Sequence, residues 1–286
     1  MIKKMILLAL AVLALNSGSL QAAAAKSAAA TAPRYEDTCK PGTADATSWC
    51  KGGCCHYALW EIAANCTAHP VQWQPPKSCD GAMLPPAALC ASVVFQDRDG
   101  DAGSVTFNDT RMNPCLASKP AFMHLLTIPR KRVCGNDDPA RFELASSIWN
   151  SAWKAARAFL AKQQQEGTIS GAAAEMNNVA LVVNSVQQRS QNQLHVHALR
   201  LKPGIREEIM RLSPPPAHIS SLNEVWDTAA QLSGGRASYG MLVMRDLENS
   251  GFLVAVTDGG LGENPTPEHN NSPESRFTCG NCNTCP

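Results

Sequence analysis

His195 and His197, which are separated by a single valine, are the side chains of this sequence best placed to do chemistry. Apolar residues alternate with others over residues 194–201, a pattern that predicts a β-strand. Side chains two positions apart on a strand share a face, so both imidazoles should lie side by side. A neutral imidazole is a good nucleophile near pH 7, and the pair therefore favours transfer of a group to histidine.

A polar loop leads directly into this predicted strand. Amide and guanidinium groups in such a loop can offset negative charge on phosphoryl oxygens. The loop and the two imidazoles together suit a phosphate group that undergoes transfer. The polar side chains concerned are Gln187, Gln188, Arg189, Gln191, Asn192 and Gln193.

Two other interpretations of the histidine pair remain open. The histidines can be ordinary members of a sheet, each with its own hydrogen-bond partner. They can also chelate zinc, because two histidines at this spacing point to the same side of a strand. No Asp, Glu or Cys nearby in the sequence supplies an obvious third ligand, so we predict neither a metal site nor a cofactor.

The elements around this strand predict an α+β fold with a mainly antiparallel sheet. Asp138 and Pro139 form the start signature of a long helix, whose apolar residues then fall on one stripe. Short helices are expected at 205–212 and 221–231. The further expected strands are 91–96, 104–108, 122–128, 179–183, 239–244 and 252–257, and the last two form a hairpin.

Composition excludes several classes of protein. The chain has 286 residues, with 25 Lys and Arg against 24 Asp and Glu. That balance argues against a nucleic-acid partner, which would require a basic surplus. Charged residues make up 17% and hydrophobic residues 44%, so the chain is not disordered.

The first residues predict export. Lys3 and Lys4 precede an apolar stretch at 5–15, and small residues follow at Ala22–Ala25. This pattern is typical of a cleaved secretory signal over residues 1–24, and it predicts a periplasmic or envelope-associated protein. A retained anchor is the alternative, although the apolar stretch is shorter than the about 20 residues of a spanning helix.

The cysteines predict a disulfide-rich N-terminal extension. All 12 lie after residue 24, and an even number in an exported chain favours disulfides. We expect a Cys-rich lobe at 25–90, a catalytic domain at 91–262 and a Cys-containing tail at 263–286. The tail has metal-like Cys-x-x-Cys spacing, but export favours disulfides there too, and one economical arrangement ties the tail to the N-terminal region.

Two segments resemble the histidine-triad superfamily. Residues 184–199 resemble its motif of histidines alternating with apolar residues, and residues 124–132 resemble its upstream strand and turn. Within the superfamily the resemblance is to the CDP-diacylglycerol pyrophosphatases of bacterial envelopes, over roughly residues 115–260. The run from Arg200 to Arg206 and the Ser-Tyr-Gly at 238–240 are similar to further segments of that family. Its glycine before Arg189 is glutamine here, and the third histidine position is Leu199.

The resemblance implies a histidine-triad-like sheet with one long helix, and roles for individual residues. His197 matches the histidine that attacks phosphorus and becomes nucleotidyl-histidine, and His195 matches the one that sets its position and tautomer. The remaining residues are expected to bind the substrate: Asn184, Arg189, Gln191 and Asn192 at the phosphate, His124 at the nucleotide and Arg206 at the lipid phosphate.

The function that follows is hydrolysis of CDP-diacylglycerol to CMP and phosphatidate at a membrane surface. One alternative is a histidine-triad-type hydrolase or transferase for a soluble nucleotide. Others are a secreted nucleotide-binding module without catalysis and an envelope protein that binds metal through its Cys tail. The oligomeric state and the preferred nucleobase do not follow from the sequence.

Overall fold

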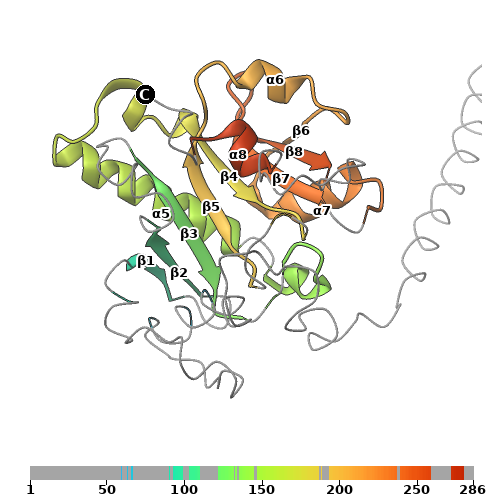
Figure 1. Ribbon diagram of the computed structural model, residues 1–286, viewed down its shortest axis with the longest axis horizontal. Helices are drawn as coiled ribbons and strands as arrows, with labels where there is room; N and C mark the ends of the chain where they lie inside the picture. Colours follow the sequence, from blue (N-terminus) through green and yellow to red (C-terminus); the bar gives the residue numbers. More distant parts are fainter. Residues whose placement is uncertain are drawn as a thin grey trace, which may run out of the picture. The chain divides into compact units, whose positions relative to one another are not determined.

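An eight-stranded antiparallel sheet forms the centre of the part of the chain that the structure describes (Figure 1). The structure is a computed structural model, and its strand order is β1-β2-β3-β5-β4-β7-β8-β6. With the helices below, this sheet confirms the α+β prediction. The structure describes residues 59, 63, 66, 90, 93–98, 103–109, 122–131, 133, 135–144, 147–186, 188, 193–236, 239–258 and 272–279. All of them belong to the compact unit Tyr35–Pro286.

The strands lie where alternation and apolar runs predict them. They are β1 (Val93–Asp97), β2 (Ser104–Asn108), β3 (His124–Pro129), β4 (Val179–Val183), β5 (Val196–Arg200), β6 (Ala217–Ile219), β7 (Tyr239–Arg245) and β8 (Phe252–Asp258). β1 and β2 form an antiparallel pair, and β7 and β8 form the expected hairpin. The short strand β6 was not predicted, and it pairs with β8.

The long helix begins later than predicted. Pro139 opens a 3₁₀ helix, η4 (Pro139–Leu144), and the α-helix α5 spans Ser147–Gln165. The Asp138 carboxylate accepts a hydrogen bond from the Ala140 backbone at 2.9 Å, so the predicted cap starts the 3₁₀ turn and not α5. The remaining helices are α6 (Arg206–Met210), α7 (Val225–Leu232), α8 (Pro273–Phe277), η5 (Gly171–Ala174), η6 (Met176–Asn178) and η7 (Leu222–Glu224).

The two faces of the sheet pack against different helices, which explains why β4 is apolar throughout. Val179, Leu181 and Val183 join a core with α5 and α7. Ala180 and Val182 join a second core with α6 and α8. Successive side chains of a strand alternate between faces, so a strand covered on both sides is buried at every position.

Strand β5 follows the same alternation, and this orients the histidines. Leu194, Val196 and Ala198 lie in the core with α5. His195 and His197 therefore point to the opposite face. There His197 is paired in register with Val182 of β4, whose side chain packs in the core with α8.

The predicted signal and most of the predicted Cys-rich lobe lie outside the described residues. Cys66 and Cys90 form a disulfide within the segment expected to be stapled. Leu59, Ala63 and Cys66 pack with residues of β2 and β3. Cys279 in the C-terminal tail is also disulfide-bonded. Its tie to the N-terminal region stays a prediction, as does the framework of the other cysteines.

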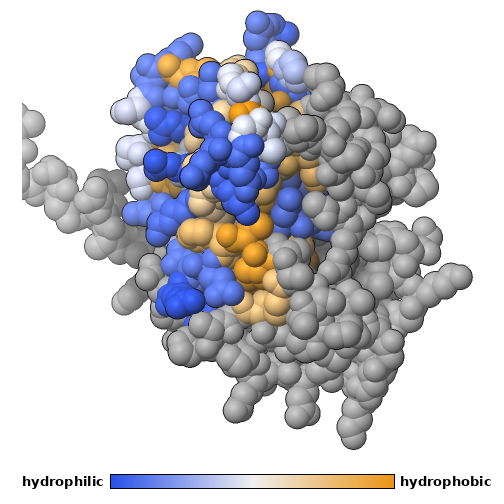
Figure 2. All heavy atoms as spheres, turned by 90° about the vertical axis from the view of Figure 1, so that its left-hand side faces the viewer, coloured by the Kyte–Doolittle hydropathy of each residue, from blue (hydrophilic) through white to orange (hydrophobic). Residues whose placement is uncertain are grey.

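None of the described helices is long and apolar enough to cross a membrane. On the face drawn in Figure 2, an apolar band lies between hydrophilic side chains. The large exposed hydrophobic residues of the described segments belong to separate elements and loops: Val94, Phe142, Met210 and Leu247.

Candidate functional site

His195 and His197 lie together on β5 and just before it, as the alternation predicted. Their ring centroids are 4.7 Å apart and the rings are inclined by 62°. Both residues are buried, with 7% and 5% of their surface exposed. Both side chains lie on the face of the sheet opposite the core with α5, which contains the neighbouring Leu194, Val196 and Ala198.

His124 joins the pair from the neighbouring strand β3. It is paired in register with Leu199, which makes His197 its diagonal neighbour on the same face of the sheet. His124 Nε2 lies 3.0 Å from His197 Nδ1. The two ring planes differ by only 20°, and the ring centroids are 5.3 Å apart. The 3.0 Å between the two facing nitrogens accounts for most of that separation. The imidazoles are therefore nearly coplanar and joined edge to edge by one N–H···N hydrogen bond.

Asn184 follows the last residue of β4 and approaches the other side of His197. Its Nδ2 lies 3.5 Å from His197 Nε2 and donates a hydrogen bond of 2.8 Å to Glu274 Oε2. Asn184 Oδ1 is buried, and among the described residues no group donates to it. Asn184 thus contacts the predicted nucleophile, and its place beside the phosphate stays a prediction.

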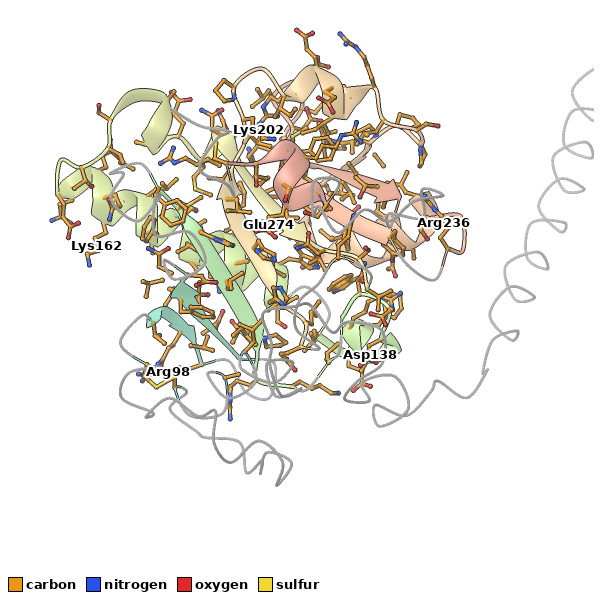
Figure 3. The ribbon with its side chains drawn as sticks, viewed as in Figure 1. Arg98, Asp138, Lys162, Lys202, Arg236 and Glu274 are labelled. Carbon is orange, nitrogen blue, oxygen red and sulfur yellow. A yellow bond between two sulfur atoms is a disulfide. The ribbon has the colours of Figure 1, made fainter. Side chains whose placement is uncertain are left out.

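Glu274 completes the cluster and was not predicted. Its carboxylate lies 3.5 Å from His124 Nε2 and 3.6 Å from His197 Nε2. Figure 3 shows Glu274 at α8, in front of β4 and β5. No motif surrounds it, but Ser272 and Pro273 are a helix-start signature. That signature could have located α8, although not its contact with the histidines.

Burial and charge set the protonation of the cluster. Burial lowers the pKa of His197 to about 3, and the neighbouring Glu274 carboxylate only partly opposes this. Burial of Glu274 opposes its ionisation, but attraction to His197 and His124 and the hydrogen bond from Asn184 lower its pKa to about 2. At neutral pH the His197 imidazole is therefore neutral and Glu274 is a carboxylate.

The backbone fixes the tautomer of His195. Its Nδ1 lies 2.7 Å from the Gln193 carbonyl oxygen. A carbonyl oxygen only accepts, so Nδ1 carries the proton, and the lone pair of the neutral ring is on Nε2. The hydrogen bond holds the His195 ring at a fixed angle beside His197.

Acidification is expected to destabilise the fold through this cluster. In the unfolded chain His197 binds a proton below its ordinary pKa of 6.5, but in the folded protein only below about 3. Glu274 binds a proton below its ordinary pKa of 4.5 in the unfolded chain, but only below about 2 in the folded protein. The unfolded state binds more protons throughout that range, so stability falls as the pH drops from 6.5 towards 2.

The measurement is the urea midpoint between pH 7 and pH 4 for the wild type and for His197→Gln. Glutamine does not titrate, so the midpoint of the variant should depend less on pH. The same dependence in both proteins would contradict the lowered pKa of His197.

Among the described residues, one group has ligand atoms close enough to share a metal ion. His124, His197 and Glu274 each offer one such atom, and these lie within 4.8 Å of one another. The residue types suit zinc, whose bonds to histidine nitrogen are about 2.0–2.1 Å. A metal ion would have to break the hydrogen bond between the two imidazoles, because the facing nitrogens are only 3.0 Å apart.

The structure does not bring every predicted residue to this cluster. Arg206 donates to the backbone oxygens of Asn177 and Arg245, at the end of β4 opposite Asn184. Lys202 donates to the Ser275 and Arg276 carbonyls. The predicted phosphate ligands Arg189, Gln191 and Asn192 lie outside the described residues.

The comparisons with known proteins identify the family of the chain. The family model for CDP-diacylglycerol pyrophosphatase matches residues 56–258, a range that includes the three histidines and Asn184 but ends before Glu274. A protein of Yersinia pestis named CDP-diacylglycerol pyrophosphatase is 25% identical over 190 residues, which cover 66% of this chain and 58% of that relative. Because the family model matches most of its length, this chain belongs to the CDP-diacylglycerol pyrophosphatase family.

Proposed function

We propose that the protein hydrolyses the pyrophosphate bond of CDP-diacylglycerol to CMP and phosphatidate through a nucleotidyl-histidine at His197. The observation that carries this proposal is His197 itself. Its imidazole is buried and neutral, and it is hydrogen-bonded to His124 on a sheet that the family model matches. A neutral imidazole keeps the lone pair that attack on phosphorus requires.

In the first step Nε2 of His197 attacks the CMP phosphorus. A nitrogen–phosphorus bond forms, the bond from phosphorus to the bridging oxygen breaks, and phosphatidate leaves with the bonding pair. Nε2 has a free lone pair only when the proton is on Nδ1, where His124 Nε2 can accept its hydrogen bond. His124 would thus select the reactive tautomer of His197, in addition to any contact with the nucleotide.

In the second step water attacks the same phosphorus. The nitrogen–phosphorus bond breaks, its electron pair returns to Nε2, the attacking water gives up a proton to the solvent, and CMP is released. Phosphatidate leaves as a phosphate monoester, which is a stable anion, so its departure places little demand on a general acid. His195, fixed beside His197 by its hydrogen bond to Gln193, keeps the nucleophile in line.

The phosphate oxygens would be held by Asn184 and by the loop residues Arg189, Gln191 and Asn192. Amide and guanidinium donors at these positions would offset the charge that develops on the phosphoryl group. The acyl chains of the substrate stay in a bilayer, so the protein would work at a membrane surface after export to the periplasm or envelope. The histidine-triad-like fold is part of the same proposal.

The test is to incubate the purified protein with CDP-diacylglycerol that carries label on the CMP phosphate. Labelled CMP and unlabelled phosphatidate are expected, and quenching under alkaline conditions should leave label on the protein. Dinucleoside polyphosphates should be split far more slowly. Release of mononucleotides from these alone would favour the soluble-nucleotide alternative, and binding without turnover would favour a binding module.

Removal of divalent metal ions is expected to leave turnover unchanged, because attack by His197 requires only its own lone pair. The measurement is the initial rate after dialysis against a chelator, compared with the untreated protein. Loss of turnover that added zinc restores would contradict this, and would indicate that His124, His197 and Glu274 act as metal ligands.

A further inference from the structure

We propose that the C-terminal segment Ser272–Cys279 is part of the catalytic site, and that Glu274 is a positioning residue for His197. This inference rests on the proposed function, since it assigns Glu274 a role in the same reaction. Glu274 lies beyond the range that the family model matches, which ends at residue 258. The segment also belongs to the tail that the sequence placed outside the catalytic domain.

The start of α8 fits closely against the sheet. Ser272 is buried, and its hydroxyl accepts a hydrogen bond from the Ser275 backbone at 3.2 Å, which caps the helix. Pro273 lies against Gly240 of β7, where an added Cβ would be only 2.7 Å from the proline ring. The residue immediately before Glu274 is therefore held in place by direct packing.

The end of α8 is anchored to the chain that leaves β5. Thr278 forms a β-bridge with Leu201, and the Cys279 backbone donates to the Arg200 carbonyl at 2.8 Å. Lys202 Nζ donates to the carbonyl oxygens of Ser275 and Arg276, each at 2.7 Å, and Figure 3 shows Lys202 beside α8.

A buried aromatic ring completes the attachment. Phe277 is fully buried and packs with β4 and β7 residues in the core on this face. Cys279 is disulfide-bonded. The segment is thus built into the domain, and a carboxylate delivered by it keeps a defined position relative to β5.

That position lets Glu274 act on both imidazoles. Its oxygens lie 3.5 Å from His124 Nε2 and 3.6 Å from His197 Nε2, too far for good hydrogen bonds but close enough for strong electrostatic attraction. Asn184 holds one oxygen at 2.8 Å and prevents the carboxylate from turning away.

The attraction becomes important when His197 bonds to phosphorus. The imidazole then gains a positive charge, which it shares with His124 through their hydrogen bond. A carboxylate beside both rings stabilises this charged state more than the neutral resting state, so it accelerates the chemical step more than it aids substrate binding.

The experiment compares Glu274→Gln and Glu274→Asp with the wild type on CDP-diacylglycerol. The kcat of Glu274→Gln should fall by roughly 10- to 100-fold, with KM changed by less than about threefold. Glu274→Asp keeps the charge, so its kcat should fall less than that of Glu274→Gln. Glu207→Gln is the matched control, because Glu207 is 82% exposed and pairs only with Arg211 among the described residues. Its kcat should equal that of the wild type.

The pH profile separates an electrostatic role from a merely structural one. Glu274 raises the pKa of His197 against the effect of burial. Loss of its charge should move the acid limb of kcat to lower pH in Glu274→Gln but not in Glu274→Asp. Melting curves check that both variants fold. If Glu274→Gln does not, the kcat of Glu274→Asp decides, and a wild-type kcat in that variant would overturn the role of Glu274.

The outcomes distinguish this inference from the function on which it rests. If the wild type releases CMP and Glu274→Gln keeps the wild-type kcat and pH profile, the role of Glu274 is overturned and the proposed function stands. If the wild type neither releases CMP nor becomes labelled, the proposed function itself is overturned, whatever the Glu274 variants show. A fall in kcat with an unchanged pH profile would also overturn the electrostatic role.

Discussion

Replacement of His197 by glycine should lower the turnover of CDP-diacylglycerol by about 10⁴-fold or more, because it removes the atom that bonds to phosphorus. No other side chain of the cluster can take over easily. His124 Nε2 faces His197, and the His195 ring is held at another angle by its bond to Gln193. The measurement is release of labelled CMP, together with label retained on the protein after an alkaline quench.

His195→Gly is the companion variant. It should keep measurable labelling of the protein at a reduced rate, since His195 only orients the nucleophile in the proposed mechanism. If His195→Gly instead lost the label while His197→Gly retained it, His195 would be the nucleophile and the proposed assignment of the two histidines would be wrong. Melting curves of both variants show whether the buried cavity that each creates unfolds the protein.

Gly240→Ala should reduce activity by more than about tenfold without touching a reacting group, since overpacking of this kind typically costs about 1–3 kcal/mol and displaces its neighbours. An alanine Cβ at this site would be 2.7 Å from both Pro273 Cγ and Thr257 Oγ1. The proline ring would have to move outward and take Glu274 with it. The kcat and the midpoint of thermal unfolding are the two measurements.

A second-site change provides the control for this prediction. Combining Gly240→Ala with Pro273→Ala removes the ring atoms that cause most of the clash, so the double variant should regain part of the lost activity. The same kcat in the double variant and in Gly240→Ala would show that the effect does not pass through Pro273. A fully active Gly240→Ala would show that α8 tolerates displacement.

Local sequence patterns were sufficient to predict most strands of the sheet. The alternation around His195 and His197 predicted their shared face because strand geometry depends only on neighbouring residues. The apolar run of β4 predicted a strand for the same reason. The start of α5 was misplaced, because the Asp138 and Pro139 signature fits a 3₁₀ turn as well as an α-helix.

Local sequence patterns predicted only part of the candidate site. Asn184 and the two histidines lie close together in the chain and belong to one motif. His124 was singled out, but its hydrogen bond to His197 depends on the register between β3 and β5. Arg206 had a plausible charge for a lipid phosphate, yet the fold uses its guanidinium to hold backbone carbonyls.

The sequence by itself determined the paired histidines, the strands that carry them and the resemblance that the family match supports. Only the tertiary structure decided that His124 faces His197 and that Glu274 lies beside both. The physical reason is that strand register and the docking of α8 arise from packing between residues distant in the chain. A carboxylate in a tail without a motif carries no local signal of the imidazoles that it will meet.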